Sequence, residues 1–533
     1  MKKLNLVLLT AGLLSTLPVM AQQQNTLIYC SEGSPTSFDA AQSTTGTTFD
    51  AAAHPIYNTL TQVKRGTTEI EPGLAESWEV SDDGLTYTFH LRKGVKFHTT
   101  NYFKPTRDFN ADDIIYTFDR LSNAEHPFNK AYPAEFPYYK EMSLDKTIKT
   151  IEKLDDYTIK MVLNDIDASF LQTIAMPIGG IYSAEYLEHL LKTGKAANIA
   201  HEPLGTGPFI FQRYQKDASI RYKANKDYWD KENMPLVDNL LFSINTDPAV
   251  RAQKLQAGEC HLMSYPLPAD IPNLKKNDKL KIISAPGFNV GFLYYNTEKE
   301  PTNNAAVRRA LDMAINRSSL IPAVYGEQGQ AAINPMPPTQ WSYNKDIKAT
   351  EYNIEQAKAL LAEAGYPNGF TIDLWSLPVQ RPYNPNGRLM AELLQSDWAK
   401  IGVKANIVTY EWGEYLKRSS KGEHQVSMVG WTGDNGDPDN WLGNLFGCAA
   451  VNGSNHSRFC YEPFQKLLDE AKRSADHEHR IKLYEQAQVI FHEQKPASPI
   501  GTSIVNVPMA KNVEGYKVSP YGSIHFKGVS LTP

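Results

Sequence analysis

The alternation of apolar and polar residues in the first half of the chain predicts short strands joined by tight turns. In DDGLTYTFHLRKGVKFH, the apolar residues Tyr87, Phe89 and Leu91 alternate with polar ones, and Asp83 and Gly84 supply a turn before them. The segment TIKTIEKLDDYTIKMVLN has the same form, with its turn at the DD pair. This pattern is typical of a meandering antiparallel sheet.

A helix and a glycine-containing turn interrupt these strands. Asn110 precedes ADDIIYTFDRL, and a capping residue followed by acids in the first turn predicts a helix. Further on, PLGTGPFIFQRY contains Gly205 and Gly207, but Pro208 and a strand follow where a phosphate loop needs a third glycine and a helix. We interpret this segment as a structural turn whose glycines permit a positive φ.

After Asn289 the pattern changes to strands that alternate with helices. VGFLYYN predicts a buried strand, and NNAAVRRALDMAINRSSLIPAVY predicts helices. Asn353 then caps IEQAKALLAEA, which Gly365 ends, and FTIDLWS, RLMAELLQSDWAKI and VKANIVTY follow as strand, helix and strand. This alternation predicts an α/β lobe with a mixed or parallel sheet over residues 289–504. We expect the tail, NVEGYKVSPYGSIHFKGVSL, to rejoin the first lobe, so that two chain crossings form a hinge.

The amino terminus has the form of a secretory signal. MKKLNLVLLTAGLLSTLPVMAQQQ combines early lysines, an apolar run and small residues, and we expect cleavage after Ala21, so that residues 1–21 are removed. No cysteine lies near that site to carry a lipid, and no later apolar run approaches about 18 residues. The sequence therefore predicts an exported, soluble and unanchored chain.

Length and charge limit the possible architecture and partners. The 533 residues exceed what one hydrophobic core usually organises, so two large lobes or more are expected. The formal net charge is −5, and loss of the signal lysines makes it more negative. A mildly acidic exported chain is a poor candidate for a nucleic-acid partner.

Four cysteines remain after export, and an even number in an oxidising compartment favours disulfides, for which three pairings are possible. Cys448 and Cys460 lie close together around the turn-rich VNGSNHS, so a local bridge is the simplest arrangement. Cys30 and Cys260 would then pair with each other. A zinc site is the alternative, but no CxxC pair supports it.

The sequence contains none of the common catalytic motifs. It lacks a GxSxG elbow, an HExxH pair, a full phosphate loop and a GxGxxG after a strand. The 13 histidines are scattered, and the nearest pair, His477 and His479, does not share a helix face. We therefore expect no enzyme, and keep as an alternative an exported peptidase whose paired acids do general acid–base work.

The segment GWTGDNGDPDNW, which begins at residue 430, places three aspartates among glycines and tryptophans. A calcium loop counted from Asp434 would need oxygen ligands where the chain has Gly436 and Leu445. The spacing therefore does not support a calcium site, and we expect no metal. A captured ammonium group is the remaining interpretation.

A second candidate charge lies in LPVQRPYNPNG, where prolines stiffen the loop around Arg381. The alternative is a surface arginine in an ion pair. If Arg381 and Asp434 both face a cleft, they can hold a carboxylate and an ammonium group. Two extended residues span roughly 7 Å, so such a pair would select a dipeptide by length. Trp412 and Trp431 lie near strand ends, where α/β sheets bind ligands.

The glycines of the acidic segment have a possible role in the same hypothesis. Gly430, Gly433 and Gly436 lack side chains, so the backbone could approach the ligand and pair with it as an added strand. Such pairing reads the peptide backbone and leaves the ligand's side chains free.

Several segments together resemble a known family: GLAESWEVSDDGLTYTFHLRKGVKFH, GTGPF, VQRPYNPN, TYEWGEYLKR and GWTGDNGDPDNW. They are similar to the family 5 extracellular peptide- and nickel-binding receptors of ABC transporters, most of all to the periplasmic dipeptide receptors of Gram-negative bacteria. The resemblance runs from about Thr26 to the end. It implies a class II, two-lobe α/β fold of the large peptide-receptor type, with mixed sheets and a two-strand hinge. Lobe I would cover residues 22–288, with an extra subdomain at roughly 57–205, lobe II residues 289–504, and the return residues 505–533.

The resemblance also implies a binding site and a role. Asp434 matches the acid that takes the ligand ammonium, and Arg381 the arginine that takes its carboxylate. The other matching positions are first-lobe polar and backbone contacts and aromatic or glycine residues of the pocket: Thr44, Thr45, Gly46, Tyr383, Trp412, Trp431 and Gly433. Both disulfides fit the family. The implied role is a monomeric periplasmic receptor that delivers dipeptides to an inner-membrane permease and needs no cofactor.

The same resemblance leaves other ligands open. Related receptors for haem or glutathione share much of the acidic segment, so VQRPYNPN is the stronger indication of a dipeptide. A haem receptor would use an axial histidine, methionine or tyrosine near the cleft mouth. Binding of unfolded chains is a further possibility that the sequence does not decide.

Overall fold

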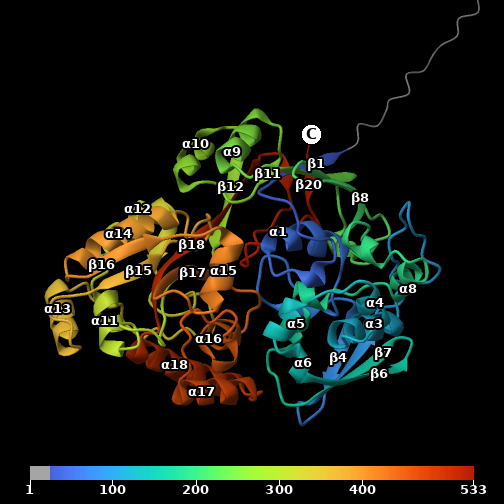
Figure 1. Cartoon of the computed structure of the whole chain (residues 1–533). Helices are drawn as coiled ribbons and strands as arrows, with labels where there is room; N and C mark the ends of the chain where they lie inside the picture. Colours follow the sequence, from blue (N-terminus) through green and yellow to red (C-terminus); the bar gives the residue numbers. More distant parts are fainter. Residues whose placement is uncertain (1–24, 533) are drawn as a thin grey trace, which may run out of the picture.

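The largest sheet runs through the whole molecule and mixes parallel with antiparallel strands (Figure 1). The computed structural model describes residues 25–532, so the predicted signal peptide lies outside the described residues. β1 pairs in parallel with β10 and β11, and β15 with β16 and β17. In sheet order the strands are β16 (Lys404–Val408), β15 (Thr371–Trp375), β17 (Val426–Thr432), β13 (Asn289–Tyr295), β18 (Ala497–Ala510), β11 (Leu262–Met263), β1 (Thr26–Ser31), β10 (Asn239–Ile244), β9 (Ser219–Ala224) and β8 (Phe209–Gln215), with β12 (Leu280–Pro286) and β14 (Gly329–Ala331) also on β18.

Two chain segments connect the halves of this sheet. The first half of β18 pairs with β13, and its second half pairs with β12 from Ile504 to Ala510. β12 and β13 are consecutive in the chain, separated by Gly287 and Phe288. These antiparallel crossings form the expected two-strand hinge and complete the mixed α/β fold that was predicted.

The buried side chains fall into separate cores on the two sides of this connection. The elements packed on the cluster that contains Leu27 are called lobe I here, and those packed on the clusters around Leu293 and Phe446 are called lobe II. The C-terminal tail belongs to lobe I, because Tyr516 and Ile524 join its core. The exact lobe and subdomain boundaries stay predictions.

Lobe I also carries the meander expected in the first half of the sequence. Its four-stranded antiparallel sheet buries Tyr87, Phe89 and Leu91 on one face, as the alternation predicted. In order, its strands are β4 (Ala75–Val80), β5 (Thr86–Leu91), β7 (Thr158–Leu163) and β6 (Ile148–Asp155), and two small sheets pair β2 (Thr61–Val63) with β3 (Ile70–Pro72) and β19 (Val513–Glu514) with β20 (Ser530–Leu531).

Helices cover both lobes, and among residues 25–532 none is long and apolar enough to cross a bilayer. In the first half they are α1 (Gly46–Thr48), α2 (His54–Ile56), α3 (Ala111–Ser122), α4 (Pro127–Ala131), α5 (Pro137–Glu141), α6 (Leu144–Thr147), α7 (Phe170–Ile174), α8 (Ala184–Lys192), α9 (Pro248–Ala257) and α10 (Ile271–Lys276). In the second half they are α11 (Ala305–Met313), α12 (Arg317–Tyr325), α13 (Ile354–Glu363), α14 (Gly387–Ala399), α15 (Trp412–Ser420), α16 (Asp439–Phe446), α17 (Glu462–Lys472) and α18 (His477–Gln494).

Local signals in the sequence place several of these elements correctly. Asn353 accepts a hydrogen bond from the backbone N–H of Gln356 and so caps α13, which ends before Gly365 at a φ of +93°. Both disulfides are present, with Cα–Cα distances of 5.8 Å for Cys30–Cys260 and 4.6 Å for Cys448–Cys460.

The explanation given for Gly205 and Gly207 is wrong. Neither residue has a positive φ. A Cβ on Gly205 would lie 2.1 Å from the carbonyl oxygen of Ile56, and one on Gly207 would lie 2.5 Å from that of Pro55. The glycines are needed because two backbone segments pass close to each other, a long-range contact that local sequence does not reveal.

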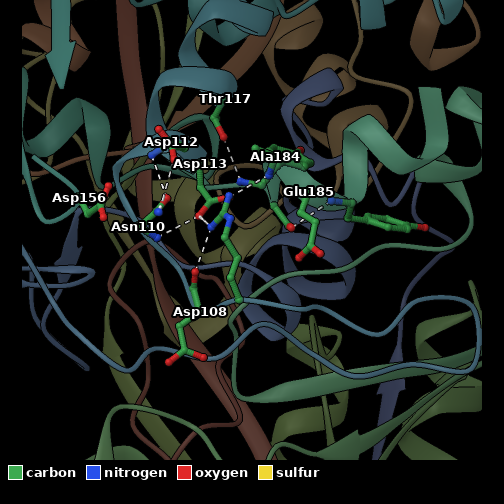
Figure 2. A network of polar contacts seen from close by, with 12 residues as sticks. Asp108, Asn110, Asp112, Asp113, Thr117, Asp156, Ala184 and Glu185 are labelled. Atoms are coloured by element: carbon green, nitrogen blue, oxygen red, sulfur yellow. Dashed lines mark hydrogen bonds and ion pairs between the residues drawn. The ribbon is translucent and has the colours of Figure 1, made fainter. Parts of the chain in front are cut away.

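A buried carboxylate, Asp113, joins the amino-terminal ends of two lobe I helices (Figure 2). Both guanidinium nitrogens Nη1 and Nη2 of Arg107 donate to it, at 2.7 and 2.8 Å. The backbone N–H of Asn110 at the start of α3 donates at 3.0 Å, and that of Ala184 at the start of α8 donates at 2.8 Å. Burial raises the pKa of Asp113, and these four donors oppose that shift.

Replacement of Asp113 by alanine should destabilise the protein by about 3–5 kcal/mol, because it leaves Arg107 and two backbone N–H groups without their acceptor. Urea unfolding followed by tryptophan fluorescence measures the change. The matched control is Asp112→Ala on the same helix, where the exposed carboxyl pairs with Lys153, and we expect a loss of no more than about 1 kcal/mol. Equal losses in the two variants would contradict the assigned role of Asp113.

Candidate ligand-binding cavity

A cavity of about 1000 Å³ lies between the lobes and is lined by both. Lobe I contributes the segment from Thr44 to Asn58, and lobe II contributes the loop around Arg381 and the end of β17. The C-terminal tail supplies a third part of the wall. The structure brings all the residues of the predicted site to this one cavity: Thr44, Thr45, Gly46, Arg381, Tyr383, Trp412, Trp431, Gly433 and Asp434. Their contacts with a ligand stay a prediction.

Asp434 lies in the loop after β17 and presents a half-buried carboxyl group to the cavity. The hydroxyl of Tyr138 from lobe I donates to its Oδ1 at 2.9 Å, and Asn440 Nδ2 lies 3.3 Å from its Oδ2. No cation pairs with it among residues 25–532. Burial raises the pKa of Asp434 to about 7, although both hydrogen bonds oppose that shift. A cationic group that entered the cavity would stabilise the ionised form.

The other two aspartates of the acidic segment have structural partners. Asp437 is buried, and both its oxygens lie 2.8 Å from Nη2 of Arg480. Asp439 lies 3.6 Å from the amino group of Lys472. Neither lines the cavity. No group of three or more histidine, cysteine, aspartate or glutamate side chains suited to a metal occurs in residues 25–532.

Arg381 offers a positive charge without a carboxylate partner. Its backbone N–H and carbonyl oxygen bond with Asn384 at 3.1 and 3.0 Å, which closes a tight loop. Its guanidinium donates to the carbonyl oxygen of Gln380 and lies 4.9 Å from the centre of the Trp412 ring. Within the described part of the chain it makes no ion pair. The alternative of a surface arginine in an ion pair is therefore wrong.

Close packing with glycines fixes this loop and the acidic segment. Tyr383 is buried, and a Cβ on Gly430 would lie 2.1 Å from its ring. Similarly, a Cβ on Gly433 would lie 2.3 Å from the ring of Phe288, whose carbonyl oxygen accepts the Gly433 N–H at 2.8 Å. These glycines therefore make room for the protein's own side chains. An added strand of ligand along them stays a prediction.

Sequence reasoning missed several cavity residues. Tyr138 and Glu141 belong to α5, a short helix that carries no motif. Glu32 directly follows β1 and accepts hydrogen bonds from the hydroxyls of Thr47 and Ser264, at 2.6 and 2.9 Å. Its position after a central strand is the signal that could have identified it. The cavity residues of α5 and the tail had no comparable signal.

Comparison with known proteins agrees with the geometry. The model of the bacterial extracellular solute-binding proteins, family 5, matches residues 69–453. The chain is 57% identical over 524 residues to di/tripeptide-binding protein 1 of Pseudomonas aeruginosa, covering 98% of this chain and 97% of that protein. It is 48% identical to heme-binding protein A of Haemophilus influenzae, covering 96% and 93%.

A solved structure extends the similarity to three dimensions. The dipeptide-binding protein of a Pseudoalteromonas species in complex with Met-Leu superposes with a TM-score of 0.87 and 36% identity, covering 95% of this chain and all of that one. The matched family consists of solute-binding receptors. From the extent of these matches, this chain belongs to family 5 of the bacterial extracellular solute-binding proteins.

Proposed function

We propose that this protein is a periplasmic receptor that binds dipeptides in the cavity between its lobes and delivers them to an inner-membrane ABC permease. The observation that carries the proposal is that two opposite charges without an ion-pair partner among residues 25–532, Asp434 and Arg381, line the same cavity. A zwitterion supplies both missing partners. Relatives named di/tripeptide-binding and dipeptide-binding proteins, at 57% and 50% identity, support the same ligand class.

In the proposed complex, Asp434 accepts a hydrogen bond from the ligand ammonium and Arg381 donates to the ligand carboxylate. Because both groups line the cavity and are partly buried, each contact is stronger than on the exposed surface. Thr44, Thr45 and Gly46 are exposed toward the cavity from lobe I and would contact the ligand backbone. Trp412, Trp431 and Tyr383 would enclose the ligand side chains, and the backbone of Gly433, which also lines the cavity, would contact the ligand.

Haem is a second candidate ligand because of the size of the cavity and the name of one relative. The volume of about 1000 Å³ stands at the upper end of the range for small-molecule sites and exceeds the needs of a dipeptide. A relative at 48% identity is named heme-binding protein A. His54, His525 and Met176 line the cavity and could supply an axial ligand. Glutathione, with a free amino group and carboxylates, is a peptide of intermediate size.

Calorimetric titration of unfolded and refolded, ligand-free protein distinguishes these ligands. We expect tight binding of dialanine and weak binding of alanine, trialanine and N-acetyl-dialanine, because only dialanine carries both terminal charges at the roughly 7 Å that two extended residues span. Haemin and glutathione are titrated in parallel. Binding of haemin without dialanine would replace the proposed ligand. Incubation of trialanine with the protein, followed by chromatography, checks that no peptide bond is cleaved.

Arg381→Ala and Asp434→Asn should each weaken dialanine binding by about 2–5 kcal/mol, because each leaves a desolvated ligand charge without a partner. In Asp434→Asn, dialanine and N-acetyl-dialanine should bind with similar affinity, since the contact to the ammonium is lost. Calorimetry measures both effects. The matched controls Arg388→Ala and Asp346→Asn remove exposed charges of the same kind outside the cavity. Parent-like binding by both site variants would contradict the two-charge model.

Dialanine affinity should fall about tenfold between pH 7.5 and pH 6, because the pKa of Asp434 is about 7 in the free protein. The ligand ammonium binds the ionised carboxylate and lowers its pKa, so binding releases a proton below pH 7. Above about pH 8 the affinity should fall again as the ligand amine is neutralised. Calorimetry in buffers of different ionisation enthalpy measures the proton release.

The groups that face Asp434 are Tyr138 and Glu141 of α5 and Tyr521 of the tail. Burial raises the pKa of Glu141 as well, and its charge adds to the shift at Asp434. Asp434→Asn separates the contributions: a flat affinity between pH 6 and pH 7.5 in this variant assigns the dependence to Asp434. An unchanged dependence would assign it to another group.

A further inference from the structure

Four of the residues that line the cavity, here called the basic annex, carry nitrogen-bearing side chains. They are Arg65 of the β2–β3 turn, His54 of α2, and His525 and Lys527 of the tail. The rings of His54 and His525 are in contact, with their centres 4.1 Å apart and their planes tilted by 48°. These residues come from distant parts of lobe I, so the fold assembles the annex and no single motif encodes it.

Arg65 carries a positive charge with only neutral hydrogen-bond partners. Its Nη1 donates to the side-chain oxygen of Asn233 at 3.1 Å, and its Nη2 donates to the carbonyl oxygen of Gly515 at 2.6 Å. Gly528 leaves space for this guanidinium, because a Cβ there would lie 2.3 Å from Nη1. Within the described residues no carboxylate lies within ion-pair distance of Arg65. The guanidinium is thus fixed in place, and burial lowers its pKa although the charge of Asp230 partly opposes that shift.

Lys527 supplies a second positive charge that is nearly enclosed. Its side chain is 11% exposed, and its Nζ donates to Gln62 Oε1 at 3.1 Å. The nearest carboxylate, Asp230, is 3.9 Å away and does not line the cavity. Burial lowers the pKa of Lys527, and Asp230 opposes that shift only in part. A carboxylate on the cavity side would favour the charged ammonium.

The acids that line the cavity in the described chain are Glu32, Glu141 and Asp434, and none of them belongs to the annex. His54 and His525 add neutral hydrogen-bonding nitrogens, because burial, reinforced by Lys527 at His54, lowers the pKa of His54 to about 3. Burial also places the pKa of His525 well below its usual range. The annex therefore combines two cations with neutral donors, the arrangement that suits a desolvated anion.

We infer that the basic annex binds a carboxylate of the ligand beyond the peptide terminus, so that the receptor prefers dipeptides with an acidic side chain. This inference rests on the proposed dipeptide function. Arg65 and Lys527 are the specificity-determining residues, and His54 and His525 complete the donor set. A porphyrin propionate carries the same carboxylate chemistry, so haemin is the alternative source of the bound group.

Calorimetry with matched dipeptides tests the inference. The probes are Glu-Ala and Ala-Glu, their neutral counterparts Gln-Ala and Ala-Gln, and dialanine. We expect at least one glutamate peptide to bind about tenfold more tightly than its glutamine counterpart. Arg65→Met and Lys527→Met should each remove most of this preference and leave dialanine affinity within about twofold. Lys517→Met is the matched control, because this exposed lysine lies near the same turn but outside the cavity.

The outcomes separate this inference from the proposed function. If dialanine binds and the glutamate preference is absent from the parent, or survives in both Arg65→Met and Lys527→Met, the annex has no such role. If no dipeptide binds but haemin binds more weakly to both variants than to the parent, the annex stands and the dipeptide function fails. If no dipeptide binds and haemin affinity is equal in all variants, both fail. Thermal unfolding of each variant establishes that it is folded.

Discussion

A half-buried carboxyl group with no cation beside it among residues 25–532 is the constraint around which the cavity is arranged. Asp434 has only a phenol and an amide as side-chain donors, and burial moves its pKa toward neutrality. The protein could have satisfied this group with an arginine, as it does for Asp437 with Arg480. Among residues 25–532 no arginine pairs with Asp434, so the free protein holds this partly buried acid without a counter-charge. A ligand cation would supply that counter-charge. Affinity for the ligand and instability of the empty site thus have the same origin.

The surrounding structure keeps this unfavourable group in position. Asp437 and Asp439, within five residues of it, bind cations of α18 and α17. Gly433 packs on Phe288 at the start of lobe II, and Asn440 accepts hydrogen bonds from both the Asp434 N–H and the Trp431 indole. These contacts leave the loop backbone little freedom and keep the Asp434 carboxyl at the cavity. One acid therefore recognises the ligand while its neighbours in sequence hold the loop.

The sequence predicted the parts of this arrangement that local chemistry encodes. Alternation of residues identified the meander of lobe I and the strands and helices of lobe II, and proline-stiffened or acidic loops identified Arg381 and Asp434. It did not identify Tyr138, Arg65 or Lys527, since these reach the cavity only through long-range packing of helix, turn and tail. Gly205 and Gly207 show the same limit. Glycine is needed at both positions because a backbone segment about 150 residues away packs against them, and no local sequence pattern indicates that contact.

In the proposed receptor, the two residues that hold the ligand termini, Arg381 and Asp434, both belong to lobe II. The ligand termini can bind lobe II before lobe I approaches, and closure then removes water from contacts already made. The polar contacts between the lobes include the Tyr138–Asp434 hydrogen bond, one backbone bond from the Ala168 N–H to the Lys472 carbonyl, and two ion pairs, the exposed Arg473–Asp165 and Lys472–Asp167 at 3.7 Å. Each contributes roughly 0–1.5 kcal/mol. A few kcal/mol of differential binding by the ligand is enough to shift the population of the lobes from open to closed.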